Sequence, residues 1–246
     1  MPEILEQLGY LVPKETIGKL YDDMVAGTAK EIGKFSADVT KTARLILAPL
    51  QVMAAFQDRF EKMVGRIRDR VPDARMIESP AELVGPVLEK MRYVDERSHL
   101  WKMYEEVLTK SVDQDQHENI HPAFGHIISQ LSRDEAWVLY RLRDHIFKVV
   151  DELTLNRKEN RFENRVIIES ELPKAELYLP DKMELYYSHL ASLALVEWPV
   201  ERQDSILDDQ RVQVGVRRYS KMLLTDFGRL FVSACIPHPG FEPLKK

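Results

Sequence analysis

The strongest constraint on this chain is a long apolar seam between Val39 and Val71. The members of the seam alternate at spacings of three and four residues, the seven-residue repeat of a helix packed along one side. They are Val39, Ala43, Ile46, Leu50, Met53, Phe60, Val64, Ile67 and Val71, with Gln57 as the single polar member. The repeat predicts a helix of about 33 residues, about 50 Å long. Pro49 should kink or divide this helix.

Residues 43–56 are apolar nearly all round, so this half of the helix needs cover on several sides. We predict a central core helix, and the alternative is a surface for self-association or peripheral membrane contact. The candidate interaction residues are Ile46, Leu50, Met53 and Phe60. Arg44, Pro49 and Gln51 interrupt a run that is shorter than the roughly 20 residues of a membrane span, so we expect no spanning segment.

The composition narrows the function classes. The net charge of -5 and the pI near 5.9 argue against a protein that coats nucleic acid by charge alone. Cys235 is the single cysteine, which excludes an intramolecular disulfide and fits a reducing compartment. Glu3 and Glu6 stand where a signal peptide carries positive charge. We therefore expect a cytoplasmic protein.

Three capping signals predict further helices. Ser79-Pro80-Ala81-Glu82 should cap a helix that runs to about Tyr93, and Asp95 should cap the next one. Residues 131–135, Leu-Ser-Arg-Asp-Glu, form a second capping box. The helix that follows should continue past Phe147, because apolar residues keep helical spacing to Leu153.

The C-terminal part mixes helices with strands. A strand is predicted over residues 165–169, a helix after Asp181, and a strand where Val212, Val214 and Val216 alternate. Thr225 should cap the last helix. Helix, hairpin and helix in this order resemble the winged-helix regulators. The predicted fold class is therefore mainly α: an N-terminal multi-helix region (1–118) with one long helix, then a His-Pro junction and winged-helix-like α+β domain (119–246) with a small antiparallel hairpin.

Winged helices can read DNA, and four basic residues could contact nucleic acid. They are Arg211, Arg217, Arg218 and Lys221. The predicted recognition helix, however, begins Asp181-Lys-Met-Glu184, and acidic residues outnumber basic ones over residues 181–236. These charges favour a winged fold used for protein contact over one that reads DNA.

Residues 117–121, His-Glu-Asn-Ile-His, spell the zinc-protease pattern H-E-x-x-H. That chemistry needs both histidines on one face of a continuous helix. Pro122 biases His121 away from the helical region, so the second ligand lies where a helix is disfavoured. We predict instead that His121 caps a helix opened by Pro122, with Phe124 packing inward, and we expect no metal, cofactor or catalytic residue.

Several short pieces in sequence order resemble the Abi-alpha (abortive infection alpha) family of bacterial proteins. The most specific are residues 119–124, Asn-Ile-His-Pro-Ala-Phe, and residues 130–136, Gln-Leu-Ser-Arg-Asp-Glu-Ala; residues 224–228, Leu-Thr-Asp-Phe-Gly, also fit. The family-motif residues, to which we assign a structural role, are Asn119, His121, Pro122, Phe124, Leu131 and Ser132.

The resemblance implies defence against phage, in which an infected cell stops growing or dies before phage mature. The leading hypothesis is a non-enzymatic protein that acts through a protein partner, a homo-oligomer or the membrane surface. The alternatives are a winged-helix DNA-binding regulator of a defence gene and, more remotely, a zinc hydrolase. No small-molecule substrate is identified.

Overall fold

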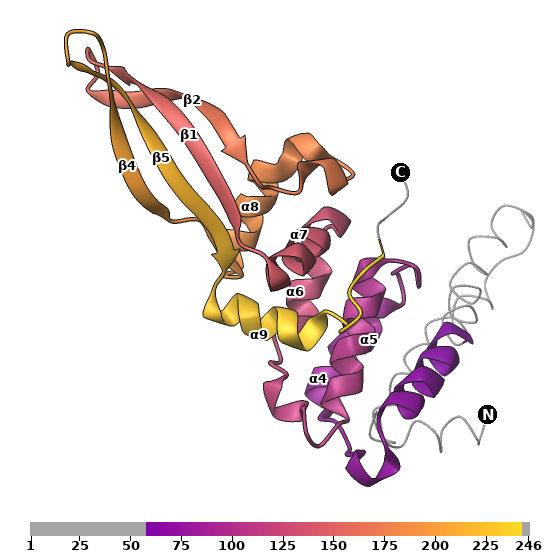
Figure 1. The fold of residues 1–246 in the computed structure, drawn as a ribbon. Helices are drawn as coiled ribbons and strands as arrows, with labels where there is room; N and C mark the ends of the chain where they lie inside the picture. The colour runs from indigo at the N-terminus through magenta and orange to yellow at the C-terminus, as the bar shows by residue number, and fades with distance from the viewer. Residues whose placement is uncertain (1–57, 243–246) are drawn as a thin grey trace, which may run out of the picture. The chain divides into compact units, whose positions relative to one another are not determined.

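A computed structural model describes residues 58–242 and divides the chain into two compact units, Met1–Leu131 and Ser132–Lys246 (Figure 1). The predictions that concern Pro49, Ile46, Leu50 and Met53 lie outside the described residues. Each unit is described by itself below.

The described part of the first unit is helical. It contains a helix over residues 58–70, α4 (Ala81–Met91), α5 (His99–Ser111) and α6 (Phe124–Gln130). The helices α4, α5 and α6 contact one another. Gly125 allows α6 to approach α4 closely, because a Cβ at this position would lie 2.7 Å from Cγ2 of Val87.

The seam residues that fall within the described helix are buried. Phe60 is 9% exposed, and Val64, Ile67 and Val71 are covered more completely. The helix is also held to α5 by charge: Arg66 binds both carboxylate oxygens of Glu105 at 2.8 Å, and Arg70 binds the buried Glu106 at 2.6 Å. This end of the seam is therefore packed core.

Two of the predicted helix caps in this unit are wrong. The side chain of Ser79 does not cap α4, whose N-cap is Pro80 without a side-chain hydrogen bond. Ser98, not Asp95, caps α5 by accepting from the backbone N–H of Leu100 at 3.0 Å. Asp95 instead accepts from the backbone N–H of Arg97, so the chain makes one more turn before α5 begins.

The second unit combines helices with an antiparallel sheet (Figure 1). In chain order its elements are α7 (Arg133–Asp144), β1 (Phe147–Asn156), β2 (Arg161–Ser170), α8 (Met183–Ser192), β3 (Val196–Glu197), β4 (Val200–Leu207), β5 (Gln213–Leu224) and α9 (Asp226–Cys235). The sheet order is β2-β1-β5-β3, and β4 also pairs with β5.

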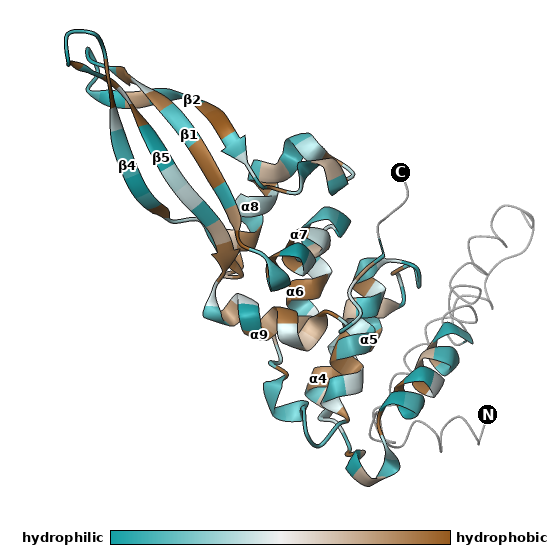
Figure 2. Cartoon of the chain, in the orientation of Figure 1, coloured by the Kyte–Doolittle hydropathy of each residue, from teal (hydrophilic) through white to brown (hydrophobic). Residues whose placement is uncertain are grey.

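The helices of this unit gather at one end of the sheet, where β1 begins and β5 ends (Figure 1). The turns of the β1-β2 and β4-β5 hairpins lie at the opposite end. Hydrophobic colour in Figure 2 is concentrated where β5 meets the helices, whereas β4 is mainly hydrophilic. The core of the unit includes Phe147, Val149, Leu190, Met222 and Phe231.

The prediction of a mainly α chain with a small hairpin is wrong: the protein is α+β, with a five-stranded antiparallel sheet. The helix predicted to pass Phe147 ends at Asp144, and His145 is extended. Residues 147–156 form β1 instead. The polar stretch before Asp209 contains β4, and β5 continues to Leu224.

Each error has a physical reason. The buried positions of β1 alternate as Phe147, Val149 and Asp151, and a carboxylate at the third position hid the period-two pattern. The strand β4 pairs only with β5, and nearly all of its side chains are exposed. A two-sided polar edge strand has the composition of a loop.

Other local predictions are confirmed. Ser132 and Glu135 form the capping box of α7, with hydrogen bonds of 3.2 and 2.7 Å. The side chain of Thr225 caps α9 by accepting from the backbone N–H of Gly228 at 2.8 Å. The strand predicted over residues 165–169 lies within β2. A separate finding is that none of the helices within residues 58–242 combines the length and hydrophobicity of a membrane span. The prediction for residues 43–56 lies outside the described residues.

Candidate functional site

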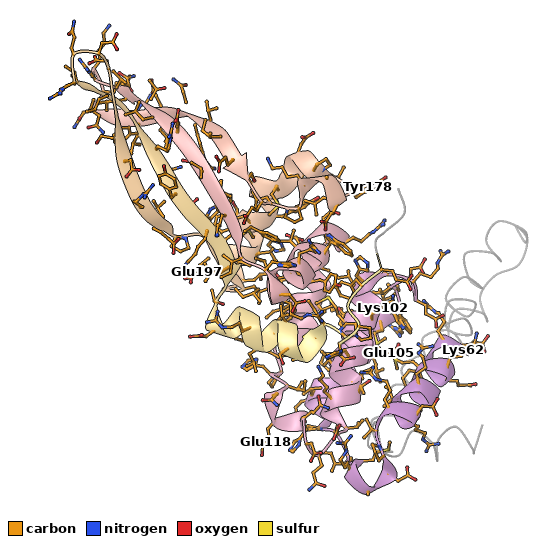
Figure 3. The ribbon with its side chains drawn as sticks, in the orientation of Figure 1. Lys62, Lys102, Glu105, Glu118, Tyr178 and Glu197 are labelled. Atoms are coloured by element: carbon orange, nitrogen blue, oxygen red, sulfur yellow. The ribbon has the colours of Figure 1, made fainter. Side chains whose placement is uncertain are left out.

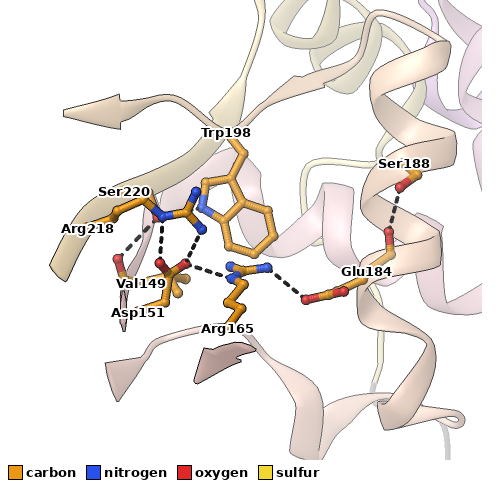
Figure 4. Close-up of polar contacts among 8 residues, drawn as sticks. All are labelled: Val149, Asp151, Arg165, Glu184, Ser188, Trp198, Arg218 and Ser220. Carbon is orange, nitrogen blue, oxygen red and sulfur yellow. Dashed lines mark hydrogen bonds and ion pairs between the residues drawn. The ribbon is translucent and has the colours of Figure 1, made fainter. Parts of the chain in front are cut away.

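A cavity of about 300 Å³ lies on the face of the sheet that α8 approaches. Its lining comes from every long strand of the sheet, from α8 and from the residues that lead into β4 (Figure 4). The lining residues are Asp151, Arg165, Glu184, Tyr187, Ser188, Trp198, Val200, Arg218 and Ser220.

Asp151 lies at the base of the cavity and its side chain is only 2% exposed. It continues the inward face of β1 after Phe147 and Val149, and the strand pairing places it directly opposite Arg218 on β5. Nε of Arg218 donates to Oδ1 at 2.7 Å, and Nη2 donates to Oδ2 at 3.0 Å. This is the two-point geometry of strong arginine–carboxylate pairs.

A β-bulge directs Arg165 to the same carboxylate. Thr154 pairs with Glu163 and Glu152 pairs with Val166, so β2 has two residues where β1 has one. Asn164 adopts the positive φ of 55° that the bulge requires. Nε of Arg165 then donates to Oδ2 of Asp151 at 2.7 Å.

The outer end of Arg165 reaches α8, where its Nη1 donates to Oε1 of Glu184 at 2.8 Å. Asp151 and Glu184 therefore hold Arg165 from both ends (Figure 4). The ion pairs connect β1, β2, β5 and α8, and the two acidic residues balance the two arginines.

Trp198 forms an aromatic wall beside these charges. Its ring centroid lies 5.3 Å from the Arg165 guanidinium and 5.1 Å from the ring of Tyr187, which is perpendicular to it. Nε1 of Trp198 donates to Oγ of Ser220 at 2.9 Å, and this hydroxyl donates to the carbonyl of Val149 at 3.2 Å. The indole is thus fixed at its polar edge, while its face borders the cavity (Figure 4).

The charges around Asp151 determine its ionisation. Burial by itself would raise the pKa of Asp151, but the hydrogen bonds and positive charges of Arg218 and Arg165 outweigh it and hold the pKa below the ordinary value of an aspartate. A general base works best with a pKa near the working pH. The geometry is therefore suited to binding, with Asp151 as a permanent anion that positions the arginines.

The four residues predicted to contact nucleic acid do not form one patch. Arg217 and Arg218 are neighbours on β5 and point to opposite faces; Arg217 pairs with Glu152 at 2.8 Å, and Arg218 pairs with Asp151. Lys221 pairs with Glu201. Arg211 lies in the β4-β5 turn with a φ of 62°.

The His-Pro motif lies in the first unit, just before α6. The predicted cap by His121 is wrong, because α6 begins at Phe124 and its N-cap is Ala123, without a side-chain hydrogen bond. The backbone N–H of Ala123 donates to Nδ1 of His121 at 3.1 Å, and the His121 ring lies 5.7 Å from that of Phe124. Phe124 is fully buried, whereas Asn119, His121 and Pro122 are exposed.

The H-E-x-x-H residues do not form a continuous α-helix. His117–Asn119 is a 3-10 helix, and Ile120 is extended. The two histidines therefore do not lie one turn apart on a helix, as the zinc-protease pattern requires. Within residues 58–242, no group of three or more His, Cys, Asp or Glu side chains could hold a metal ion.

The motif of residues 130–136 contains a polar network that the sequence did not reveal. The carboxylate of Asp134 accepts hydrogen bonds from the backbone N–H groups of Tyr178 and Leu179 and from the hydroxyl of Tyr186, at 2.8 to 2.9 Å. Glu135 closes the capping box and also lies 2.6 Å from Nδ1 of His189. Tyr178 itself projects outward from the segment between β2 and α8 (Figure 3).

This network has a structural role. Both acidic side chains are buried at the start of α7, and they hold the segment before α8 and α8 itself. Burial and the hydrogen bond to Asp134 raise the pKa of Tyr186, so its hydroxyl stays a donor. The sequence did not predict this network, because the partners of Asp134 and Glu135 lie more than 40 residues farther along the chain.

Comparisons with known proteins give one family. The family model described as "Abortive infection alpha" matches residues 52–235. A search of the curated proteins found no match.

One solved structure, of an uncharacterized protein from the hydrocarbon-degrading marine bacterium Alcanivorax borkumensis SK2, is 17% identical with a TM-score of 0.29. The alignment covers 49% of this chain and 94% of that one. The family match spans the His-Pro motif, the capping box of α7 and the cavity beside Asp151. It extends over well more than half of the sequence, and the chain therefore belongs to the abortive infection alpha family.

Proposed function

We propose that this protein defends bacteria against phage by abortive infection, and that it acts in the cytoplasm by binding a protein partner. Family membership supports the defence role. The mode of action is inferred from the second unit, where the sheet extends away from the helices and contains both hydrophilic and hydrophobic residues (Figure 2).

The observation that carries binding over catalysis is the state of Asp151. Both of its oxygens accept hydrogen bonds from arginines, and its pKa is lowered. A carboxylate in this state neither accepts nor releases a proton readily near neutral pH. The cluster instead gives the sheet a rigid shape, which favours recognition because little order must be gained on binding.

The strand β2 is our proposed contact for the partner. Among the strands of residues 58–242 it pairs with β1 alone, and it exposes Val166 (56%) and Ile168 (47%), with Phe162 farther toward the turn. Exposed apolar side chains grouped on an edge strand are typical of a protein contact. The nearby charges of Arg161 and Glu169 would form the polar rim of such a contact.

The charges of β5 make DNA a weaker candidate. Arg217, Arg218 and Lys221 each pair with a carboxylate. A phosphate group would have to displace these carboxylates, and a cation already neutralised contributes little to phosphate binding.

The test is expression in a phage-sensitive bacterium that is challenged with a panel of phages. We expect fewer plaques with the wild-type protein, and early arrest of the infected culture when most cells receive phage. The double variant Val166→Thr/Ile168→Thr keeps β-branched side chains and should lose protection while remaining folded.

The matched control is Leu207→Thr, which removes an exposed apolar side chain from the other edge strand. It should protect as the wild type does. Absence of plaque reduction with every phage counts against the defence role, and full protection by the folded double variant rules out β2 as the contact.

A further inference from the structure

We propose that the cavity beside Asp151 is a binding site for a small carboxylate ligand that carries a flat ring. This inference goes beyond the defence role and does not depend on which partner β2 contacts. It rests on the charge balance of the cluster, on the position of Glu184 and on the aromatic wall.

The fixed part of the cluster has an excess of one positive charge. Asp151 neutralises one of the two arginines that hold it, so these three groups together carry a net charge of about +1 at neutral pH. Within residues 58–242, no hydrogen bond uses Nη1 of Arg218 or Nη2 of Arg165. Both arginines line the cavity and retain donors for an anion.

Glu184 shows which kind of anion fits. Its carboxylate supplies the balancing negative charge by accepting from Nη1 of Arg165, but its side chain is 66% exposed. An exposed ion pair contributes little free energy. A ligand carboxylate can therefore take the place of Glu184 on Arg165 at small cost. A monoanion would restore neutrality, whereas a phosphate dianion would exceed the available charge.

The rest of the cavity fits a ring. Trp198, Tyr187 and Val200 provide the apolar part of the lining. A ring in contact with Trp198 and Tyr187 would gain apolar burial and aromatic contact. The volume of about 300 Å³ is at the lower end of the range for ligand sites, so the ligand is small.

Trp198 gives a direct measurement, because the other tryptophans, Trp101 and Trp137, are buried. Benzoate should quench or shift the fluorescence of the full-length protein saturably, and Trp198→Phe should remove this response. Benzamide, which has the same ring without charge, and inorganic phosphate, which has no ring, should bind more weakly. Phenyl phosphate should not bind more tightly than benzoate.

Variants separate a ligand site from a purely structural ion cluster. Glu184→Gln removes the internal competitor and should bind benzoate up to about fivefold more tightly, the upper end of the range expected for an exposed ion pair. Arg218→Gln should weaken binding about tenfold, because one charged donor is lost. The matched control is Arg217→Gln, on the same strand and the opposite face, which should leave binding unchanged.

N-acetylphenylalanine tests the source of the carboxylate. Tighter binding than benzoate assigns the site to the carboxyl end of a polypeptide, and weaker binding assigns it to a free acid. The proposal is overturned if neither the wild type nor a folded Glu184→Gln variant responds saturably to benzoate. Three other results would also overturn the proposal. Benzamide could bind as tightly as benzoate, or phenyl phosphate could bind more tightly than benzoate. The third result is an equal loss of benzoate affinity in Arg217→Gln and Arg218→Gln. Failure of phage protection leaves these outcomes unaffected.

Discussion

Asp151 and Arg218 face each other across β1 and β5, and the guanidinium group donates to both carboxylate oxygens, at 2.7 and 3.0 Å. The pair is buried on the carboxylate side and partly exposed on the arginine side. The buried Asp151 carboxylate cannot be solvated by water if its arginine partners are lost, whereas the arginines reach solvent.

Replacing Asp151 with Asn should therefore destabilise the second unit. Two arginines would lose their charged partner at a buried position. We expect the free energy of unfolding to fall by about 2 to 3 kcal/mol. This value is at the low end for buried ion pairs, because both arginines are partly exposed to solvent. Urea unfolding would measure the change. Glu152→Gln breaks the exposed pair with Arg217 and should cost less than about 1 kcal/mol. Similar losses in both variants would contradict this interpretation.

The stability due to Asp151 should depend on pH in a defined direction. Burial raises the pKa of Asp151, but hydrogen bonding to Arg218 and Arg165 outweighs burial, so the pKa in the folded protein is lower than in the unfolded chain. The stabilisation is therefore complete above the unfolded pKa, and it is lost as the pH falls through the lower folded pKa. The stability difference between wild type and Asp151→Asn should be constant from pH 7 to about pH 5 and shrink below about pH 4. A difference that stays constant below pH 4 would exclude the ion pairs as its cause.

Gly228→Ala should be strongly destabilising. A Cβ at this position would lie 1.9 Å from the carbonyl oxygen and 2.8 Å from the carbonyl carbon of Leu195, and a backbone cannot yield as a flexible side chain does. We expect a loss of about 3 kcal/mol in the free energy of unfolding, measured by urea. Gly85→Ala is the control, because nothing lies within 4 Å of its Cβ inside α4. It should stabilise by about 0.5 to 1 kcal/mol.

Asp134→Asn should loosen the segment before α8. An amide has one acceptor oxygen in place of two, and its NH2 group would face the donors of Tyr178, Leu179 and Tyr186. We expect a loss of about 2 kcal/mol and faster hydrogen exchange over residues 173–182. Ser132→Ala, which removes the cap of α7, should cost about 1 kcal/mol. In Ser132→Ala, hydrogen exchange should increase in the first turn of α7. If hydrogen exchange over residues 173–182 is unchanged in Asp134→Asn, Asp134 does not hold this segment.

Local signals in the sequence predicted the caps of α7 and α9 correctly, whereas the predicted caps at Ser79 and Asp95 were wrong. The capping box at Ser132 and the cap at Thr225 involve partners three residues away, so residue type and spacing specify them. The β-branched run of residues 165–169 likewise indicated a strand. These features need no information about distant parts of the chain.

The sheet and the cavity could not be predicted in this way. Asp151 meets Arg165 and Arg218 only through pairing with β2 and β5, and the direction of Arg165 depends on a bulge at Asn164. Asp151 itself disguised β1, because a charged residue at a buried position breaks the apolar alternation. The function of a buried charge is visible only when its partners are known.

The Asp151–Arg218 pair also distinguishes the correct alignment of β1 and β5 from its competitors. A shift of the pairing by two residues keeps each side chain on its own face, but it would set Asp151 opposite Ser220 and Arg218 opposite Leu153. The buried carboxylate would then lose both hydrogen bonds from Arg218 and keep only the one from Arg165, which destabilises the shifted pairing. A residue that looks out of place in an apolar strand thus acts during folding as a check that the two strands have met correctly.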